Sequence, residues 1–245
     1  MEIVEKVKEF YPVNGFNKTK RILKIGDKKL RKIILENKLE KNSKVRIDFF
    51  NKNFVYILGL IWADGFLGLK SNTVYIECIE DDMLRFKPIL ESISNWSFYR
   101  RERENKPTIN AYLTDKKFYD ILVENDYLNK SKFSPIKIYS KIPDIMRKYF
   151  LLGVIDGDGC FYYNKKQYTR QFIITGSIEQ DWSLFEDILN QINVKFSIIR
   201  RENKNSGYSQ IRVTNKKDLI KVGEFIYGDM IVLDRKYESW KLSIS

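Results

Sequence analysis

Apolar residues follow two different periods along this chain, and the order of the two periods is repeated. Two nearly unbroken apolar runs, ILGLIWADG at 57–65 and LLGVIDGDG at 151–159, have the composition of buried helices. After each run, segments with every second residue apolar predict strands, and segments with apolar residues three or four positions apart predict amphipathic helices. The pattern therefore predicts two copies of one αββαββα unit.

The expected elements can be given by residue range. After the first run we expect strands at 66–69, 73–79, 96–103 and 108–113 and helices at 82–93 and 116–125. After the second run we expect strands at 161–163, 171–175, 195–201 and 208–213 and helices at 180–191 and 217–226. The predicted fold is α+β, with two antiparallel sheets arranged around the two apolar helices. The expected domains are 1–48, 49–145 and 146–245.

Short identities between the two copies support a tandem duplication. The triplet Arg-Arg-Glu occurs at 100–102 and again at 200–202, an offset of 100 residues, whereas the apolar runs are offset by 94. The second copy therefore contains six extra residues after its run. We expect them in a longer hairpin loop at 163–170, where an insertion is easily accommodated.

The first 48 residues have a different pattern. A short amphipathic helix is expected at 3–11, stopped by Pro12 and an Asn14-Gly15 turn, and a second helix at 28–38 with Asp27 as its N-cap. Two short helices joined by a glycine-containing turn are typical of a helix-turn-helix, whose second helix enters the major groove. The basic residues that this second helix would present are Lys28, Lys29, Arg31 and Lys32. The alternative is a solvated basic hairpin without specific contacts.

Composition and charge narrow the function. The 245 residues carry a formal net charge of +12 and contain no histidine. Such an excess indicates a polyanionic partner, most often nucleic acid, although a ribosomal-type or merely basic protein fits as well. No apolar run is long enough to cross a membrane and the N-terminus lacks a signal core, so we expect no membrane partner. The expected location is the cytoplasm of a bacterial or phage-infected cell, with organellar encoding as the alternative.

Each apolar run ends in Asp-Gly, which is an unusual choice. A carboxylate at a helix C-terminus faces the negative end of the helix dipole, yet Asp64 and Asp158 both occupy that place. Gly59 and Gly153, at the third position of each run, would let the two helices pack closely. That packing would bring the two carboxylates together, and their like charges would require a cation between them. Helix C-caps or surface carboxylates are the alternative interpretation.

The strands also carry many basic and aromatic side chains on faces that the alternation leaves exposed. Such side chains on a broad sheet would bind phosphates and, where they reach base edges, read sequence. The basic residues expected to bind DNA there are Lys70, Arg100, Arg101, Arg103, Lys165, Lys166, Arg170, Arg200, Arg201 and Lys204. The tyrosines among them are Tyr75, Tyr99, Tyr112, Tyr162, Tyr163, Tyr168 and Tyr208.

The two apolar runs resemble the motif that names the LAGLIDADG homing endonucleases, and the resemblance covers about residues 49–245. The second copy is a very close match, and the first departs with Trp62 where the family often has an acid. The resemblance implies a pseudo-twofold monomer with a saddle of β-sheet over double-stranded DNA. It also implies two active sites that use Mg²⁺ or Mn²⁺, with Ca²⁺ binding but not supporting cleavage.

The resemblance further assigns site residues. The acid at the eighth motif position binds the metal in this family, which implies Asp64 and Asp158, with the adjacent Gly65 and Gly159 grouped at the same metal site. We expect both glycines to adopt a positive φ in a helix-to-strand turn. A lysine near each site helps to polarise water, and a polar residue follows at the end of the next strand. The matching positions are Lys130 and Lys236 for the lysines, and Glu80 and Ser177 for the strand ends.

The sequence therefore predicts a site-specific endonuclease that hydrolyses both strands of a long DNA target with a divalent metal. Phosphodiester hydrolysis by carboxylate-held Mg²⁺ needs no histidine, which agrees with the composition. The alternative is a non-cleaving nucleic-acid binder of the same fold, either a maturase that binds intron RNA or a transcription regulator.

Overall fold

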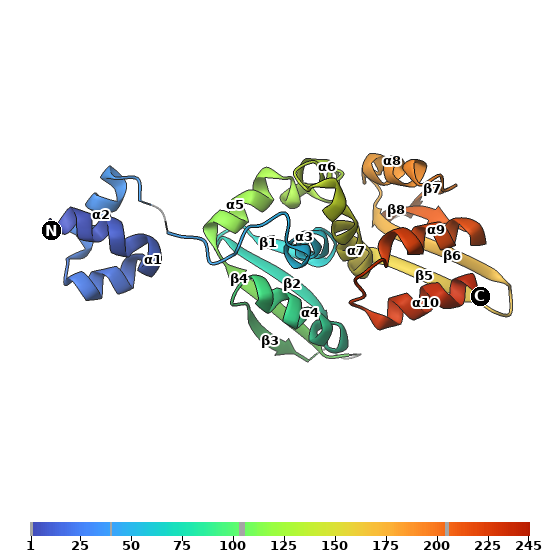
Figure 1. Cartoon of the computed structure of the whole chain (residues 1–245), viewed down its shortest axis with the longest axis horizontal. Coiled ribbons are helices and arrows are strands. Elements are labelled where there is room, and N and C mark those ends of the chain that lie inside the picture. Colours follow the sequence, from blue (N-terminus) through green and yellow to red (C-terminus); the bar gives the residue numbers. More distant parts are fainter. Residues whose placement is uncertain (1, 40, 103–105, 204–205) are drawn as a thin grey trace. The chain divides into compact units, whose positions relative to one another are not determined.

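The chain divides into two compact units, Met1–Lys44 and Val45–Ser245, each with its own hydrophobic core. The computed structural model describes residues 2–39, 41–102, 106–203 and 206–245, without the side chains of Asn203 and Ser206. Figure 1 shows the course of the chain, and the two units are described separately below. The expected boundary after residue 48 lies four residues beyond the end of the first unit.

The smaller unit contains α1 (Ile3–Leu23) and α2 (Asp27–Glu36). The expected stop at Pro12 is wrong, because α1 runs through this proline, but the expected break at Asn14-Gly15 is found, since α1 bends at Gly15, where φ is 68° and ψ is −178°. Glycine has no Cβ and adopts such a conformation without strain, so the break falls there. Three helical segments consequently follow one another, and their apolar sides meet around Val7 and Leu30, which are fully buried.

The start of α2 also differs from expectation. Gly26 occupies the N-cap position, and Asp27 is the first helical residue, with no side-chain cap. The Asp27 carboxylate instead forms an ion pair with Lys20 Nζ at 2.5 Å. This pair joins the two helices across the turn that separates them. The unit is strongly basic: its 44 residues contain thirteen Lys and Arg against six Asp and Glu, which is +7 of the net +12.

The larger unit contains the two expected repeats in the expected order. The first consists of α3 (Lys52–Asp64), β1 (Gly65–Gly68), β2 (Thr73–Ile79), α4 (Glu80–Ile93), β3 (Ser97–Arg101), β4 (Thr108–Thr114) and α5 (Lys116–Glu124). The second consists of α7 (Arg147–Asp158), β5 (Gly159–Asn164), β6 (Thr169–Ser177), α8 (Ser183–Gln191), β7 (Ser197–Asn203), β8 (Ser206–Val213) and α9 (Lys216–Ile226). The α+β, two-repeat fold is therefore confirmed.

Four further elements were not expected. Between the repeats lie a 3₁₀ turn at Tyr127–Asn129, α6 (Ile136–Tyr139) and a 3₁₀ turn at Asp144–Met146, and the chain ends in α10 (Asp234–Ile244). The last helix escaped notice because charged residues dilute its apolar positions. Its buried side chains include Trp240, which packs over Gly223 of α9, where an added Cβ would lie 1.9 Å from the indole.

Each repeat forms a four-stranded antiparallel sheet, sheet A with the order β1-β2-β4-β3 and sheet B with the order β5-β6-β8-β7. In Figure 1 the two sheets lie on either side of α3 and α7. On the helix side of sheet A, Ile76 and Ala111 are directly paired and fully buried, while Tyr75 and Tyr112 beside them point to the other face. Ile174 and Ile211 take the same places in sheet B.

The strand register locates the six extra residues of the second repeat. Gly65 pairs with Ile76 and Gly159 with Ile174, so the offset between repeats rises from 94 at the first strand to 98 at the second. Ala111 pairs with Phe98 and Ile211 with Ile198, which gives an offset of 100. Four of the six extra residues therefore lie in the hairpin, where all six were expected, and the other two lie between β6 and β7.

Helices α3 and α7 cross backbone to backbone at the two motif glycines. A Cβ added to Gly59 would lie 2.0 Å from the carbonyl oxygen of Phe150, and one added to Gly153 would lie 2.1 Å from that of Tyr56. Both distances are far below van der Waals contact, so only glycine permits this approach. The rest of each helix is buried in one continuous core.

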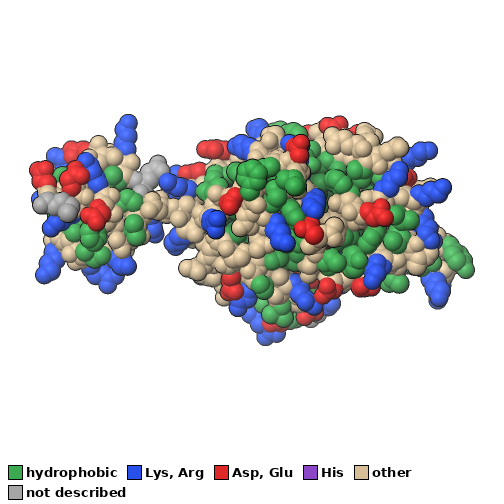
Figure 2. Space-filling model, viewed as in Figure 1, with side chains coloured by type: hydrophobic (Ala, Val, Ile, Leu, Met, Phe, Trp, Pro, Cys, Tyr) green, Lys and Arg blue, Asp and Glu red, His purple; other side chains and the backbone are tan. Residues whose placement is uncertain are grey.

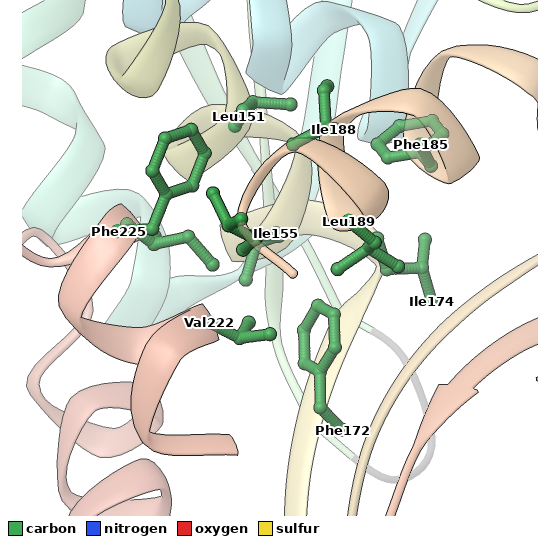
Figure 3. A pocket seen from close by; sticks show the side chains of 11 residues that line it. Leu151, Ile155, Phe172, Ile174, Phe185, Ile188, Leu189, Val222 and Phe225 are labelled. Atoms are coloured by element: carbon green, nitrogen blue, oxygen red, sulfur yellow. The ribbon is translucent and has the colours of Figure 1, made fainter. Parts of the chain in front are cut away.

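Sheet B and its helices enclose an apolar pocket, shown in Figure 3. Residues of α7, α8 and α9 line it together with Phe172 and Ile174 of β6, and every lining side chain is a hydrocarbon. It is part of the core of the second repeat. Among the described residues, no helix is long and apolar enough to cross a membrane.

Replacing Gly59 by alanine tests the helix crossing. The added methyl group cannot be accommodated without separating the helices, so we expect a loss of about 3 kcal/mol or more in unfolding free energy. Urea unfolding measures this change. Gly228→Ala is the matched control, because Gly228 is exposed and its added Cβ would meet only the terminal ammonium group of the Lys148 side chain, at 3.3 Å. Equal stability of the two variants would contradict the close crossing.

Candidate active site

The C-terminal ends of α3 and α7 meet, and each helix leads directly into the first strand of its sheet. Both helices end on the aspartate of the motif, Asp64 and Asp158. A Cβ placed on Gly157 would lie 2.3 Å from Cβ of Ala63 and 3.2 Å from a carboxylate oxygen of Asp64. The crossing therefore holds the two helix ends against each other and places both carboxylates at this seam.

Each aspartate is followed by a glycine, but not for the expected reason. Gly65 and Gly159 both have φ of −80°, so the prediction of a positive φ is wrong. An added Cβ would lie 2.6 Å from the Ile61 carbonyl oxygen at Gly65, and 2.8 Å from that of Ile155 at Gly159. The first strand starts so close beneath the last helical turn that a side chain does not fit. Glycine is needed for this close approach.

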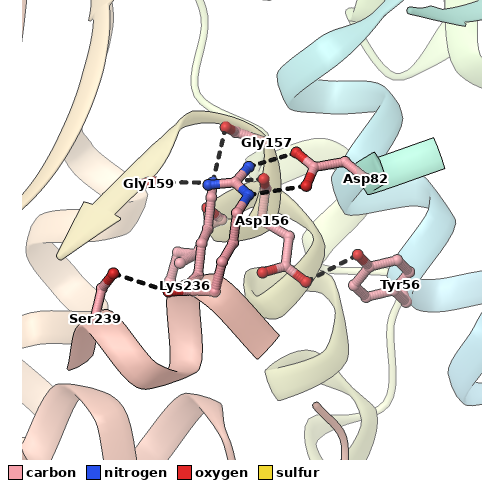
Figure 4. A network of polar contacts seen from close by, with 9 residues as sticks. Tyr56, Asp82, Asp156, Gly157, Gly159, Lys236 and Ser239 are labelled. Carbon is pink, nitrogen blue, oxygen red and sulfur yellow. Dashed lines mark hydrogen bonds and ion pairs between the residues drawn. The ribbon is translucent and has the colours of Figure 1, made fainter. Parts of the chain in front are cut away.

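Lys130 and Lys236 cap the two motif helices. Lys130 Nζ donates hydrogen bonds to the carbonyl oxygens of Ala63 at 2.6 Å and Gly65 at 2.5 Å. Lys236 Nζ likewise donates to Gly159 at 2.9 Å, and to Ile155, Asp156 and Gly157 in the last turn of α7 (Figure 4). An ammonium group at a helix C-terminus satisfies the unpaired carbonyls and offsets the negative end of the dipole.

The same contacts bear on the expected metal-site glycines. The backbone oxygens of Gly65 and Gly159 both accept a hydrogen bond from a lysine, so the structure places them with the ammonium groups. Asp64 and Asp158 are different. Neither carboxylate receives a hydrogen bond from any residue that the structure describes.

Burial controls the electrostatics of the site. It raises the pKa of Asp64, which the charges of Lys236 and Lys130 partly oppose. Although Asp158 as a residue is exposed, desolvation of its carboxylate, together with the neighbouring charge of Asp64, raises its pKa to about 6. Burial lowers the pKa of Lys130 to about 8 and also lowers that of Lys236. Carboxylates that are hard to ionise and lack donors favour a bound cation.

The residues present fit an oxygen-ligated divalent cation that the protein holds only in part. Among the described residues, no group of three or more His, Cys, Asp or Glu is placed to hold a metal. Asp64 and Asp158 would therefore be the two protein carboxylates, and water and phosphate oxygens would complete the coordination. Mg²⁺ at phosphate-transfer sites is commonly bound in this way, by one or two carboxylates together with the substrate.

A buried polar cluster that sequence reasoning missed lies beside the second helix end (Figure 4). Tyr56 of α3 donates a hydrogen bond of 2.9 Å to Asp156, which is only 2% exposed and whose other carboxylate oxygen has no partner. Close by, Arg235 of α10 makes a two-pronged ion pair with Asp82 of α4, joining the end of the chain to the first repeat. The sequence did contain a sign of this cluster, because Asp156, the sixth residue of the second apolar run, is an acid within a buried helix.

Glu80 and Ser177 do not occupy equivalent places. Glu80 begins α4 and pairs with Arg100 at 3.2 Å, whereas the Ser177 hydroxyl donates to the carbonyl oxygen of Ser131. In the observed register the equivalent of Ser177 is Ile79, so the expected alignment slipped by one residue.

The strand position on the core side near the carboxylates carries Cys78 in the first repeat and Gly176 in the second. Burial raises the pKa of the Cys78 thiol to about 12, and the charges of Asp82 and Asp64 raise it too. Sequence alignment alone could not find this position, because a shift of one residue moves a strand side chain to the opposite face.

The structure sorts the expected DNA-binding residues into three groups. On α2, the four basic side chains Lys28, Lys29, Arg31 and Lys32 are all exposed. In the turns between the first two strands of each sheet, Lys70, Lys165 and Lys166 are exposed. Arg101 and Arg201 lie on the exposed sheet faces, on the side opposite to Phe98 and Ile198. Arg103 and Lys204 lie outside the described residues.

Arg100, Arg200 and Arg170 lie on the helix side of their sheets, contrary to expectation. Arg100 pairs with Glu80 of α4, and Arg200 donates to the carbonyl oxygens of Ile178 and Gln180. Arg170 donates to the carbonyl oxygen of Ser243 in α10 at 3.1 Å. The alternation of side chains along a strand explains the misplacement, because neighbouring arginines must point to opposite faces.

A pH-dependent stability change is expected at Asp156. Burial raises its pKa from 3.8 to about 7, so the folded state holds a proton that the unfolded state releases. The contribution of Asp156 to the free energy of unfolding is therefore most favourable below pH 3.8, the pKa of the unfolded state. It is lost as the pH rises towards 7, the pKa of the folded state. At about pH 8 the free energy of unfolding of Asp156→Asn should exceed that of the parent by up to about 4 kcal/mol.

That gain should fall by more than half at about pH 5, because the free-energy difference grows in proportion to pH between the two pKa values and only about a third of it has accumulated there. Urea unfolding in the presence of a chelator measures both values. A variant that is less stable than the parent by the same amount at both pH values would show that Asp156 is ionised and paired in the folded state.

The fold and the helix-crossing site can now be compared with known proteins. No protein-family model and no curated protein matches the sequence. Among solved structures, the homing endonuclease I-WcaI bound to its DNA recognition sequence is similar, with a TM-score of 0.55, 18% identity and coverage of 92% of this chain and 97% of that chain. The LAGLIDADG homing endonuclease I-LtrWI bound to target DNA has a TM-score of 0.50 and 18% identity, and the match covers 80% of this chain and 90% of that chain.

The LAGLIDADG meganuclease I-AabMI bound to uncleaved DNA gives a TM-score of 0.53 at 14% identity and covers 78% of this chain and 88% of that chain. The chain has the fold of the LAGLIDADG homing endonucleases.

Proposed function

We propose that this protein is a site-specific endonuclease that hydrolyses one phosphodiester bond in each strand of a double-stranded DNA target, using a divalent metal ion. The observation that carries the proposal is the pair of carboxylates, Asp64 and Asp158. Crossing helices bring them to one seam, and no described residue donates a hydrogen bond to either of them. The neighbours of the same fold that were solved with DNA support DNA as the partner.

The chemistry requires little else from the protein. When bound, Mg²⁺ or Mn²⁺ would activate water and offset the charge that develops on the scissile phosphate. Asp64 and Asp158 would hold the ion from opposite helices. Lys130 and Lys236 hold the helix ends in place and bring positive charge near the phosphates. The chain has no histidine, so none of these roles falls to an imidazole.

Two repeats imply two strand cuts. Each repeat supplies one aspartate, one capping lysine and one exposed sheet face, and the two sets are related by the duplication. A single chain therefore contains both halves of the site, and we propose that it acts as a monomer. Since the two exposed faces differ in sequence, the proposed target is asymmetric.

The smaller unit is proposed to add DNA contacts. It carries more than half of the net charge of the chain in 44 residues, and α2 exposes Lys28, Lys29, Arg31 and Lys32. The second segment of α1, the turn with Lys24 at φ of 50° and α2 follow one another as in a helix-turn-helix. A protein without residues 1–44 should cut at the same bonds but protect fewer base pairs in a footprint.

Cleavage of a plasmid that carries the uninterrupted sequence flanking the gene tests the proposal. With Mg²⁺ we expect a double-strand break, and with Ca²⁺ binding without a break. Asp64→Asn and Asp158→Asn should each reduce cleavage by more than about 100-fold, because a metal ligand is lost. Both variants should still bind the DNA, since the substitution removes a negative charge that faces phosphate.

Asp120→Asn is the matched control, because this carboxylate of α5 is half-exposed and, among the described residues, its ion pair is with Lys116 on the surface. It should cut at the parental rate. Specific binding of the plasmid without Mg²⁺-dependent cleavage by the parent would instead identify a non-cleaving binder of the same fold.

A further inference from the structure

A row of aromatic side chains crosses the exposed face of sheet A. Phe66 of β1 pairs directly with Tyr75 of β2, and Tyr75 pairs directly with Tyr112 of β4. Their ring centroids are 4.6 Å and 6.1 Å apart. Tyr99 of β3 continues the row at 5.9 Å from Tyr112. All four strands of the sheet therefore contribute one ring to an unbroken row.

The geometry of the row determines which part of each ring is available. Phe66 and Tyr75 are almost parallel, at 4°, and belong to directly opposed residues on adjacent strands. Their ring faces are consequently in contact with each other, so this contact leaves only the ring edges and the outer faces uncovered. Phe66 is 48% exposed and Tyr99 is 36% exposed. Stacking of a base on the faces of Phe66 and Tyr75, as in single-strand binders, is therefore blocked on their shared side.

The polar groups beside this row satisfy one another. Arg101 lies over the Tyr99 ring at 5.1 Å and pairs with Glu77 at 3.4 Å. Glu77 also accepts hydrogen bonds from Thr108 at 3.0 Å and Asn110 at 3.3 Å. Glu77 thus neutralises the charge of Arg101, and the exposed aromatic surface of Phe66 and Tyr99 lies on the same face as this pair.

Sheet B has a different surface at the equivalent positions. By register, the places of the four aromatic residues are taken by Cys160, Ile173, Arg212 and Ile199. Arg212 Nε donates a hydrogen bond to Oε1 of the neutral Gln210 at 2.9 Å, and among the described residues neither Arg212 nor Arg201 pairs with a carboxylate. Arg212 was missed in the sequence, although its position between the buried Ile211 and Val213 predicts an exposed side chain.

The row starts beside the candidate active site. Phe66 is two residues after Asp64 in the same segment, where α3 leads directly into β1. DNA whose phosphates meet the two aspartates would therefore present the neighbouring base pairs to this face. Thymine carries the only methyl group in the major groove, and an apolar side chain recognises it by contact.

We infer that the protein reads the two halves of its target by different chemistry, with Phe66, Tyr75 and Tyr112 of sheet A selecting thymine methyl groups, and Arg212 and Gln210 of sheet B selecting bases by hydrogen bonds. The inference rests on the proposed function, because it assumes that double-stranded DNA lies across both faces. Arg and Gln are suited to guanine and adenine edges respectively, which fits the polar surface of sheet B.

Selection of binding sites from a randomised double-stranded DNA library tests the inference with the full chain and Ca²⁺. Parent protein, Tyr75→Ser and Arg212→Ser are compared. We expect Tyr75→Ser to lose base preference in one half of the selected site and Arg212→Ser to lose it in the other half. The half that depends on Tyr75 should be rich in A·T pairs. Both side chains lie on an exposed face, and circular dichroism melting verifies that the variants are folded.

A second measurement needs no variant. In the selected site, deoxyuridine replaces thymidine in one half at a time, which removes the methyl groups and nothing else. Binding of the parent should weaken by about fourfold for each contacted methyl group in the half that depends on Tyr75, and by less than about twofold in the other half.

The remaining outcomes contradict the inference in distinguishable ways. Equal effects of deoxyuridine in both halves, or no effect in either, would overturn the inference and leave the proposed function intact. Tighter binding of single-stranded oligonucleotides than of the duplex would show that the rings serve as a stacking surface instead. A library that yields no preferred sequence with the parent would overturn both the inference and the proposed function.

Discussion

The rest of this structure depends on the backbone contact between α3 and α7. Gly59 and Gly153 let each helix press against the main chain of the other, where even one methyl group would lie about 2 Å from a carbonyl oxygen. The same crossing brings the two helix ends together, positions a sheet on either side and puts the two aspartates at one seam. Packing and site geometry are therefore a single constraint, and neither repeat could form half of the site in this arrangement alone.

The price of that arrangement is electrostatic. Two carboxylates lie at the negative ends of two helix dipoles, and desolvation raises the pKa of both. Lys130 and Lys236 compensate in part by donating to the last carbonyl groups of each helix. Burial lowers the pKa values of both lysines, so it disfavours the charged form of the ammonium groups as well as that of the carboxylates. A bound divalent cation would relieve the carboxylates, which is why we regard the seam as a cation site.

Much of the fold followed from the sequence, because hydrophobic period and internal repetition are local properties. The two apolar runs, the order of strands and helices and the places of Asp64 and Asp158 all came from such patterns. Features that depend on the direction of a side chain were harder to predict from the sequence. A shift of one residue turned Glu80 away from the site, and alternation put Arg100 and Arg200 on the helix side of their sheets.

Other features arise only from long-range contacts. The buried pair of Tyr56 and Asp156 joins residues 100 positions apart, and Arg235 reaches Asp82 across 153. No pattern within one segment predicts such partners. The conformation of Gly65 belongs to the same class, since the close approach of strand and helix, and not a positive φ, requires glycine there. Differences between the two exposed sheet faces likewise became visible only once the strand register was known.

Thermal unfolding as a function of Ca²⁺ concentration, without DNA, tests the cation site most directly. The melting temperature of the parent should rise with Ca²⁺, because a ligand that binds only the folded state stabilises it. The double variant Asp64→Asn/Asp158→Asn should melt at a higher temperature than the parent in the absence of Ca²⁺ and should not respond to the ion. A parent protein that is insensitive to Ca²⁺, or a double variant that responds equally, would contradict the account.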